Sequence, residues 1–238
     1  MTMSALLERL IDKIMAAPLE MQPSENIYLQ DVFDPSVYQR MLQQLPHDDK
    51  YDDLTHPDAL LPDGRWARKL LALYNETYDR LEGEERSFWS EVCDDLASEM
   101  LQKALLYKFE DRIFERFGND IPDMVTVPIL YRDYPGYQIS IHPDSPTKVI
   151  TLQFYLPSDD SQIHLGTTFH EKRGESFVEL KTNPFRPNSA YAFVRTDHSW
   201  HSVKKMQENE SIRNTLALTV YIKGHEYRQV QRQAQSYA

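Results

Sequence analysis

Four residues in the second half of the chain have the types and spacing of an iron site with an anion-binding residue beside it. His142 and Asp144 are separated only by Pro143, His201 follows 59 residues after His142, and Arg213 follows 12 residues after His201. Two imidazoles and one carboxylate can hold Fe(II) on one face and leave the opposite face open. The permanently charged fork of Arg213 suits bidentate binding of a carboxylate. We call His142, Asp144 and His201 the ligand triad.

These residues also constrain the elements that carry them. Residues 137–141, Tyr-Gln-Ile-Ser-Ile, alternate apolar and polar side chains, which predicts a half-buried strand leading into His142. Side chains two positions apart project from the same side of a strand, so His142 and Asp144 would face one metal together. His201 must then return on another strand. We therefore expect a closed or sandwiched β architecture.

A second His-Pro-Asp triplet, at residues 56–58, provides a control for this interpretation. It lies among Asp, Pro, Thr and Gly residues with no alternating apolar pattern on either side, which predicts a loop. The surrounding acidic residues are typical of a solvated segment. We therefore expect His56 and Asp58 to hold no metal.

The surroundings of the ligand triad resemble those of a known family, the Fe(II)/2-oxoglutarate-dependent oxygenases, and in particular their prolyl-hydroxylase-like branch. The similarity covers roughly residues 124–222, with a weaker match over residues 25–46. The segments that carry it are residues 134–136 (Tyr-Pro-Gly), 142–144 (His-Pro-Asp), 149–157, 200–203 (Trp-His-Ser-Val) and 213–215 (Arg-Asn-Thr). The resemblance implies a double-stranded β-helix, or jelly roll, whose two sheets bring the His142 and His201 strands together at one mouth.

The resemblance further implies how cofactors would bind. The ligand triad would hold Fe(II), with 2-oxoglutarate and O2 as cosubstrates and no catalytic residue beyond the triad itself. Arg213 and Tyr155 would bind the far carboxylate of 2-oxoglutarate, and Thr215 and Tyr134 match further positions beside the cosubstrate. Core packing is the alternative role for the three hydroxyl-bearing residues. Halogenating relatives lack the carboxylate ligand, so Asp144 favours hydroxylation, desaturation or another oxidation.

His198, three residues before His201, is the alternative distal ligand. The Trp-His-Ser-Val segment resembles the family's strand at this point, and the family's spacing fits the 12 residues from His201 to Arg213 better than the 15 from His198. Residues 208–211 predict the turn of a hairpin whose returning strand carries Arg213. We therefore prefer His201.

The pattern of apolar residues changes from helical to strand-like near residue 123. Helical spacing predicts an amphipathic helix within residues 1–18, a helix over 35–45 capped by Asp34, and a helix over 87–117 that Gly118 ends. Strands are predicted over residues 126–132, 137–143, 148–156, 175–181, 190–195 and 214–222, with a loop around residues 164–173. The resemblance implies that this loop approaches the substrate, and an exposed polar loop is the alternative. This segregation of helices and strands predicts an α+β domain with helices on one outer face of a mostly antiparallel β structure.

A chain of 238 residues is long enough for one sizeable core, and we expect residues 1–238 to form a single domain. Within it, residues 1–123 would be a mainly helical support and lid region. Residues 124–222 would be the jelly-roll catalytic core, and residues 223–238 a C-terminal tail.

Composition narrows the class of partner and compartment. A single cysteine, Cys93, excludes an internal disulfide and fits a reducing compartment. The amphipathic N-terminal segment is interrupted by charges, unlike a signal peptide, and no apolar run approaches the length of a membrane span. The net charge is −11, and residues 1–123 alone carry −13, which disfavours a nucleic-acid partner. We expect a cytoplasmic protein with no nucleic-acid or membrane partner.

These observations predict an Fe(II)- and 2-oxoglutarate-dependent dioxygenase that hydroxylates an unactivated C–H of a small polar metabolite, such as an amino acid or a related acid. The helical half is long enough to roof the mouth and enclose such a molecule. A peptide or protein side chain is an alternative substrate. A cupin-like metal enzyme that needs no 2-oxoglutarate is a second alternative, and a non-catalytic interaction module that tolerates loss of the histidines is a third. The sequence predicts no oligomeric state.

Overall fold

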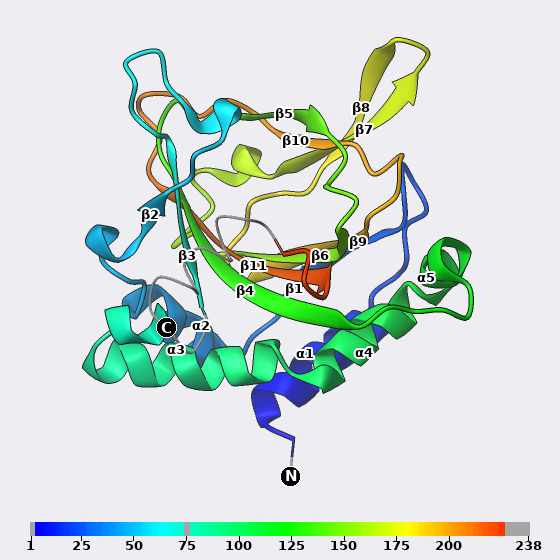
Figure 1. Ribbon diagram of the computed structural model, residues 1–238. Coiled ribbons are helices and arrows are strands. Elements are labelled where there is room, and N and C mark those ends of the chain that lie inside the picture. Colours follow the sequence, from blue (N-terminus) through cyan, green and yellow to red (C-terminus); the bar gives the residue numbers. More distant parts are fainter. Residues whose placement is uncertain (1–2, 74–76, 227–238) are drawn as a thin grey trace.

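The protein folds into two facing sheets, with helices covering the outer face of the larger one (Figure 1). The computed structural model describes residues 3–73 and 77–226. Within these residues the larger sheet has the strand order β1-β9-β6-β11-β4-β3-β2 and the smaller sheet has the order β5-β10-β7-β8. The strand pairs are antiparallel throughout. The predicted α+β jelly roll is confirmed.

The helices and strands have the following bounds. The α-helices are α1 (Ala5–Ala16), α2 (Pro35–Gln43), α3 (Gly83–Leu96), α4 (Glu99–Lys108) and α5 (Glu110–Phe117). The strands are β1 (Asn26–Gln30), β2 (Asp52–Asp53), β3 (Arg68–Ala72), β4 (Met124–Asp133), β5 (Ile139–His142), β6 (Lys148–Tyr155), β7 (Thr167–Arg173), β8 (Ser176–Thr182), β9 (Ser189–Val194), β10 (His201–Val203) and β11 (Arg213–Ile222).

The central strands of the larger sheet are covered on both faces, and their side chains alternate accordingly. Leu152 of β6 and Leu218 of β11 belong to the core cluster that also contains buried residues of α1, α3 and α4. Their neighbours Gln153 and Thr219 line a cavity between the sheets. Because successive side chains of a strand point to opposite faces, every second residue of these strands is available to the interior of the jelly roll.

The prediction of one continuous helix over residues 87–117 is wrong, because the chain forms three successive helices there. The side chain of Ser98 accepts a hydrogen bond from the backbone N–H of Leu101 and begins α4 as its N-cap. Phe109 ends α4, and α5 begins at the next residue. Helical spacing persists across both breaks because all three helices bury residues in the same core. The predicted caps at Asp34 and Gly118 are confirmed.

The helices do not roof the mouth of the jelly roll, contrary to the expected lid. They pack beneath the larger sheet, on the face away from the smaller one (Figure 1). The segment around residues 54–61, which contains the short 3-10 turn Pro57–Ala59, instead approaches β5. There the carboxylate of Asp58 accepts hydrogen bonds from the backbone N–H and the hydroxyl of Ser140. The N-terminal half also contributes β1, β2 and β3 to the larger sheet, so the sheet extends beyond residues 124–222.

Two expectations for the strands are also wrong. The segment around residues 164–173, expected to be a loop, contains β7, which pairs with both β10 and β8. Residues 208–211 do not make a hairpin, because β10 pairs with β5 and β7 in the smaller sheet whereas β11 pairs with β4 and β6 in the larger one. The connection from β10 to β11 crosses from the smaller sheet to the larger one. A local turn pattern does not reveal such long-range pairing.

None of the helices in the described part of the chain combines the length and apolar character needed to span a bilayer. Most of the expected tail, residues 227–238, lies outside the described residues.

The packing of α1 against the sheet generates a stability prediction. Leu10 is 0% exposed, so Leu10→Ala should lower the free energy of unfolding by about 2–5 kcal/mol, because it removes buried methyl groups and leaves a cavity. Met15, on the same helix, is 38% exposed, so Met15→Ala should change it by less than about 0.5 kcal/mol. Urea unfolding of both variants checks this. Equal losses would contradict the assignment of the buried face.

Candidate metal centre and adjoining cavities

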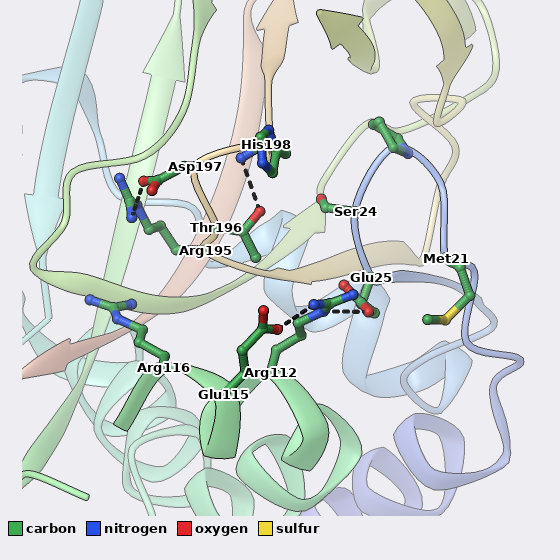
Figure 2. A pocket seen from close by; sticks show the side chains of 11 residues that line it. Met21, Ser24, Glu25, Arg112, Glu115, Arg116, Arg195, Thr196, Asp197 and His198 are labelled. Carbon is green, nitrogen blue, oxygen red and sulfur yellow. Dashed lines mark hydrogen bonds and ion pairs between the residues drawn. The ribbon is translucent and has the colours of Figure 1, made fainter. Parts of the chain in front are cut away.

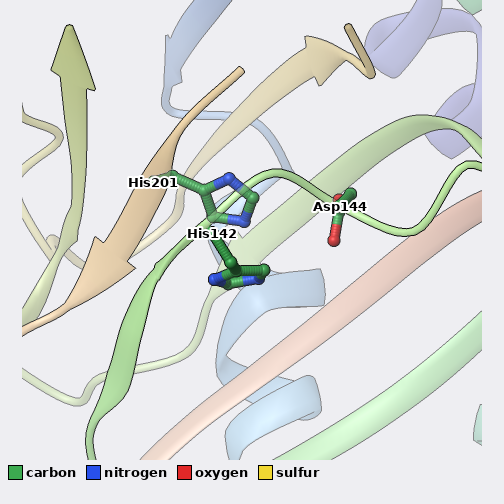
Figure 3. A group of neighbouring side chains, drawn as sticks. All are labelled: His142, Asp144 and His201. Carbon is green, nitrogen blue, oxygen red and sulfur yellow. The ribbon is translucent and has the colours of Figure 1, made fainter. Parts of the chain in front are cut away.

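The ligand triad converges at the mouth of the jelly roll (Figure 3). One ligand atom from each of His142, Asp144 and His201 lies within 4.8 Å of the other two. His142 ends β5 and His201 begins β10, and the two are direct partners in the antiparallel pairing of these strands. Two imidazoles and a carboxylate at this spacing fit an ion of the Fe(II) type that binds three protein ligands and leaves further positions open.

Backbone carbonyls orient both imidazoles. The Nδ1 atom of His142 lies 2.8 Å from the carbonyl oxygen of Ser140, and the Nδ1 atom of His201 lies 2.9 Å from that of Ser199. A carbonyl can only accept, so each Nδ1 carries the proton and each Nε2 keeps a free lone pair. This arrangement leaves both Nε2 atoms available to a metal.

Neighbouring donors hold the Asp144 carboxylate in place. The Thr151 hydroxyl donates to its Oδ2 at 2.8 Å, and the Lys148 ammonium donates to its Oδ1 at 2.6 Å. Burial alone would raise the pKa of Asp144, but the charge and hydrogen bond of Lys148, together with the two triad histidines, outweigh burial and lower it. The carboxyl group is therefore ionised, as a metal ligand must be.

Asp144 lies outside the strand that was expected to carry it. Strand β5 ends at His142, and Pro143 has no N–H with which to continue the ladder. The expectation that His142 and Asp144 project from one strand is wrong. Asp144 belongs to the segment after the strand, where Arg195 Nε donates to its carbonyl oxygen at 3.1 Å.

The alternative ligands lie elsewhere. His198 lines a separate pocket, and His201 is the histidine that joins the triad. His56 begins the short 3-10 turn Pro57–Ala59, and neither it nor Asp58 joins a cluster of metal-binding side chains in the described residues. Both nevertheless line a cavity of about 180 Å³ that also contains His142 and Asp144. The second triplet thus borders the same cavity but lies outside the ligand triad.

Arg213 is fully buried, and its guanidinium already has an anionic partner within the chain. Nη1 donates to Asp133 Oδ2 at 2.7 Å, and Nε donates to the carbonyl oxygen of Leu165 at 2.8 Å. Arg68 donates from Nε to the other oxygen of Asp133 at 2.6 Å. Asp133 is the direct strand partner of both Arg213 and Arg68, so the three side chains form one row across β3, β4 and β11. We call this row the Asp133 ion network.

The Asp133 ion network has an excess positive charge and one unused donor. Two guanidiniums share one carboxylate, and Nη2 of Arg213 is buried with no hydrogen-bond partner among the described residues. A buried donor without a partner is costly, which makes this atom a candidate ligand contact. Arg213 and the ligand triad line one cavity of about 80 Å³.

The other residues implied by the resemblance occupy three different settings. The Tyr155 hydroxyl is buried and accepts a hydrogen bond from the N–H of Thr167 at 2.8 Å. The Thr215 hydroxyl accepts one from Gln153 Nε2 at 2.8 Å. Neither residue is among those that line the 80 Å³ cavity. Tyr134 lies farther away, and its hydroxyl donates to Asp48 outside the cavity. Core hydrogen bonding therefore describes the hydroxyls of Tyr155 and Thr215, whereas the hydroxyl of Tyr134 is only partly buried.

Sequence reasoning missed several residues of the cavity wall. The Tyr191 hydroxyl donates to Gln153 Oε1 at 2.5 Å and accepts from the Thr167 hydroxyl at 2.8 Å, and all three residues line the cavity. Tyr191 and Gln153 face each other across β9 and β6. The signal that could have found them is strand alternation, because Thr151, Gln153 and Tyr155 share one face.

The comparisons with known proteins bear on the fold. No family model and no curated protein matches the sequence. A prolyl-4-hydroxylase structure from Pseudomonas putida aligns with 92% of this chain and 100% of that chain, with a TM-score of 0.56 and 12% identity. A prolyl 4-hydroxylase structure from Phytophthora capsici aligns with 96% of this chain and 70% of that chain, with a TM-score of 0.54 and 13% identity.

The chain has the prolyl 4-hydroxylase fold. The resemblance expected from the sequence is thereby confirmed at the level of the fold, which is what a likeness at this identity shows.

The environment of His201 generates a pH prediction for the metal-free protein. Burial lowers the pKa of His201 to about 4, although Asp144 acts in the opposite direction. In the unfolded chain a histidine titrates near 6.5, so between about pH 6.5 and 4 only the unfolded chain binds this proton. Stability should therefore fall as pH falls through this window, by about 3 kcal/mol at 1.36 kcal/mol per pKa unit.

Urea unfolding at a series of pH values, compared with His201→Gln, isolates this effect. The substitution should flatten the slope between pH 4 and 6.5. An identical slope in both proteins would contradict the assignment.

Proposed function

We propose that the protein is an Fe(II)- and 2-oxoglutarate-dependent oxygenase that hydroxylates a small polar metabolite. The observation that carries the proposal is the meeting of two features in one cavity. The ligand triad supplies a metal-binding set, and Arg213 supplies a buried guanidinium with a free Nη2. A cupin-like enzyme that does not use 2-oxoglutarate would have no need of the second feature.

The residues of the chain would bind and orient the reactants. Bound Fe(II), 2-oxoglutarate and O2 would supply the oxidising power that inserts oxygen into an unreactive C–H. The Nε2 atoms of His142 and His201 and a carboxylate oxygen of Asp144 would hold the metal. Thr151 and Lys148 would hold the Asp144 carboxylate in position. The presence of this carboxylate favours hydroxylation over halogenation, because it fills the place that a halide would need.

Arg213 would recognise the far carboxylate of 2-oxoglutarate through Nη2. The excess positive charge of the Asp133 ion network supports this role, because one further carboxylate would balance it. The hydroxyls of Thr167 and Tyr191 border the same cavity and would keep it polar and narrow. Tyr155 and Thr215 would contribute by fixing these wall residues through Thr167 and Gln153.

The size and charge of the outer cavity support a small substrate. Its volume of about 180 Å³ suits a metabolite, and its walls combine the cations Arg68 and Lys148 with tyrosine rings. The carboxylates of Asp58 and Asp144 line the same cavity, and Lys148 is paired with Asp144. Its mixed charges favour a small substrate with charged groups, such as an amino acid or a related acid. A prolyl side chain of a peptide is the alternative, supported by the names of the two similar solved structures.

The proposal is tested by turnover. Incubation with Fe(II), 2-oxoglutarate, O2 and a metabolite mixture should give substrate-stimulated succinate release and a product heavier by one oxygen atom. His201→Ala should abolish succinate release, because it removes one of three metal ligands. His198→Ala is the matched control and should retain it. Turnover without 2-oxoglutarate would instead support the cupin-like alternative.

Metal binding provides a readout that needs no substrate. Titration with Mn(II) should show binding by the unmodified protein and by His56→Ala, and loss of binding in His142→Ala. Equal loss in His56→Ala and His142→Ala would overturn the choice of triad.

The role of Arg213 can be measured separately. Truncating one partner of a buried charge pair typically costs about 2–5 kcal/mol, so Arg213→Gln should weaken 2-oxoglutarate binding by roughly thirtyfold or more. Calorimetry on the Mn(II)-loaded protein checks this. Arg132→Gln is the control, because Arg132 precedes Asp133 in β4 but pairs with Asp48 and does not line the cavity. Unchanged affinity in a folded Arg213→Gln protein would refute the assignment.

A further inference from the structure

A second pocket, of about 350 Å³, lies apart from the ligand triad and has a wall of charged residues (Figure 2). Its lining comes from the segment before β1, from α5 and from the segment after β9, and contains none of the triad. It is larger than either cavity at the jelly-roll mouth. The lining residues that bear on its chemistry are Ser24, Glu25, Arg112, Glu115, Arg116, Arg195 and Asp197.

One end of the pocket carries an excess of negative charge. Arg112 donates to Glu25 at 2.5 Å and also to Glu115, so one guanidinium serves two carboxylates (Figure 2). The positive charge of Arg112 balances only one of them. This end therefore has the charge of an acceptor for an ammonium group.

The other end carries an excess of positive charge. Arg195 pairs with Asp197, whose side chain is largely exposed, while no carboxylate of the described chain forms an ion pair with Arg116. Arg116 instead donates to the carbonyl oxygens of Lys148 and Pro146. Burial and the neighbouring charge of Arg195 both lower the pKa of Arg116. Two guanidiniums with one solvated carboxylate between them favour an added anion.

A polar atom on the wall of this pocket has no hydrogen-bond partner among the described residues. Ser24 is 5% exposed, and its hydroxyl oxygen is buried without a hydrogen bond to any described residue. Figure 2 shows this oxygen directed toward the side of the pocket that carries Thr196 and His198. Buried hydroxyls are normally satisfied, so an unpartnered one on the wall of a pocket indicates a place for a ligand atom.

We propose that this pocket binds a small zwitterion, with its carboxylate toward Arg116 and Arg195 and its ammonium toward Glu25 and Glu115. A simple anion would leave the acidic end unmatched, and a simple amine would leave the basic end unmatched. A metal ion has no suitable set here, since Arg112 occupies both carboxylates. The site is separate from the proposed active site and does not depend on its chemistry.

The pocket also adjoins the backbone that carries Asp144. Arg195 Nε donates to the Asp144 carbonyl oxygen, and Arg116 Nη1 donates to the Lys148 carbonyl oxygen at 2.8 Å. The two guanidiniums that would bind the zwitterion's carboxylate are therefore the ones that hold the segment between Asp144 and Lys148. An occupied pocket would fix both in this position.

Calorimetric titration of the metal-free protein tests the proposal with four probes of equal carbon number. L-Norvaline and 5-aminopentanoate carry both charges, whereas pentanoate and pentylamine carry one each. At least one zwitterion should bind about tenfold more tightly than either singly charged probe, because it alone satisfies both ends. Pentanoate or pentylamine binding as tightly as both zwitterions, or no binding by any probe, would overturn the proposal.

Variants locate the binding. Arg116→Gln should weaken binding of the zwitterion by about tenfold, and Ser24→Ala by about threefold, through lost hydrogen bonds. Glu115→Gln, at the acidic end, should weaken zwitterion binding but leave pentanoate binding unchanged. Arg86→Gln is the matched control, because Arg86 is an exposed arginine paired with Asp79 on another surface. Ser24→Ala and Glu115→Gln keep the test valid if Arg116→Gln does not fold. Zwitterion binding at the affinity of the unmodified protein in both Ser24→Ala and Glu115→Gln would refute the proposed site.

Discussion

The Asp133 carboxylate is the interaction on which the interior of the jelly roll depends. It lies between two guanidiniums that would otherwise face each other in a region closed to water, where like charges repel strongly. The row of Arg68, Asp133 and Arg213 is also a row of strand partners, so the same carboxylate ties together β3, β4 and β11. This one carboxylate balances only one of the two guanidiniums, so the cavity is left with one positive charge in excess.

The two histidines of the candidate metal centre are positioned by strand pairing at one point. His142 and His201 are opposite partners in β5 and β10, and a local irregularity follows immediately in that pairing. The backbone carbonyls of Ser140 and Ser199 then set which nitrogen of each ring faces inward. Asp144 is placed differently, by side-chain and guanidinium contacts to a segment without regular structure. The two histidines are therefore fixed by the sheet, and the carboxylate by its neighbours.

Much of the fold could be predicted because its signals are local, and the meeting of the three triad side chains could be predicted from the resemblance and spacing of their segments. The His-Pro-Asp triplet and the alternation of β6 and β11 lie in short stretches of sequence. What could not be predicted depends on contacts between distant segments. Asp133 gave no local sign of its partners, since Arg68 is brought to it by the pairing of β3 with β4. The break at Ser98 was hidden because three short helices share one apolar face.

Strands from the N-terminal half flank the sheet on both sides. β1 pairs with β9 at one margin, and β3 pairs with β4 toward the other. A fragment of residues 124–222 alone would bare both margins as rows of unpaired N–H and C=O groups, next to a sheet face stripped of its helices. Exposed edges of this kind invite edge-to-edge aggregation. Residues 124–222 alone would therefore associate with one another more readily than the whole chain, because residues 1–123 cover these strand edges and this sheet face.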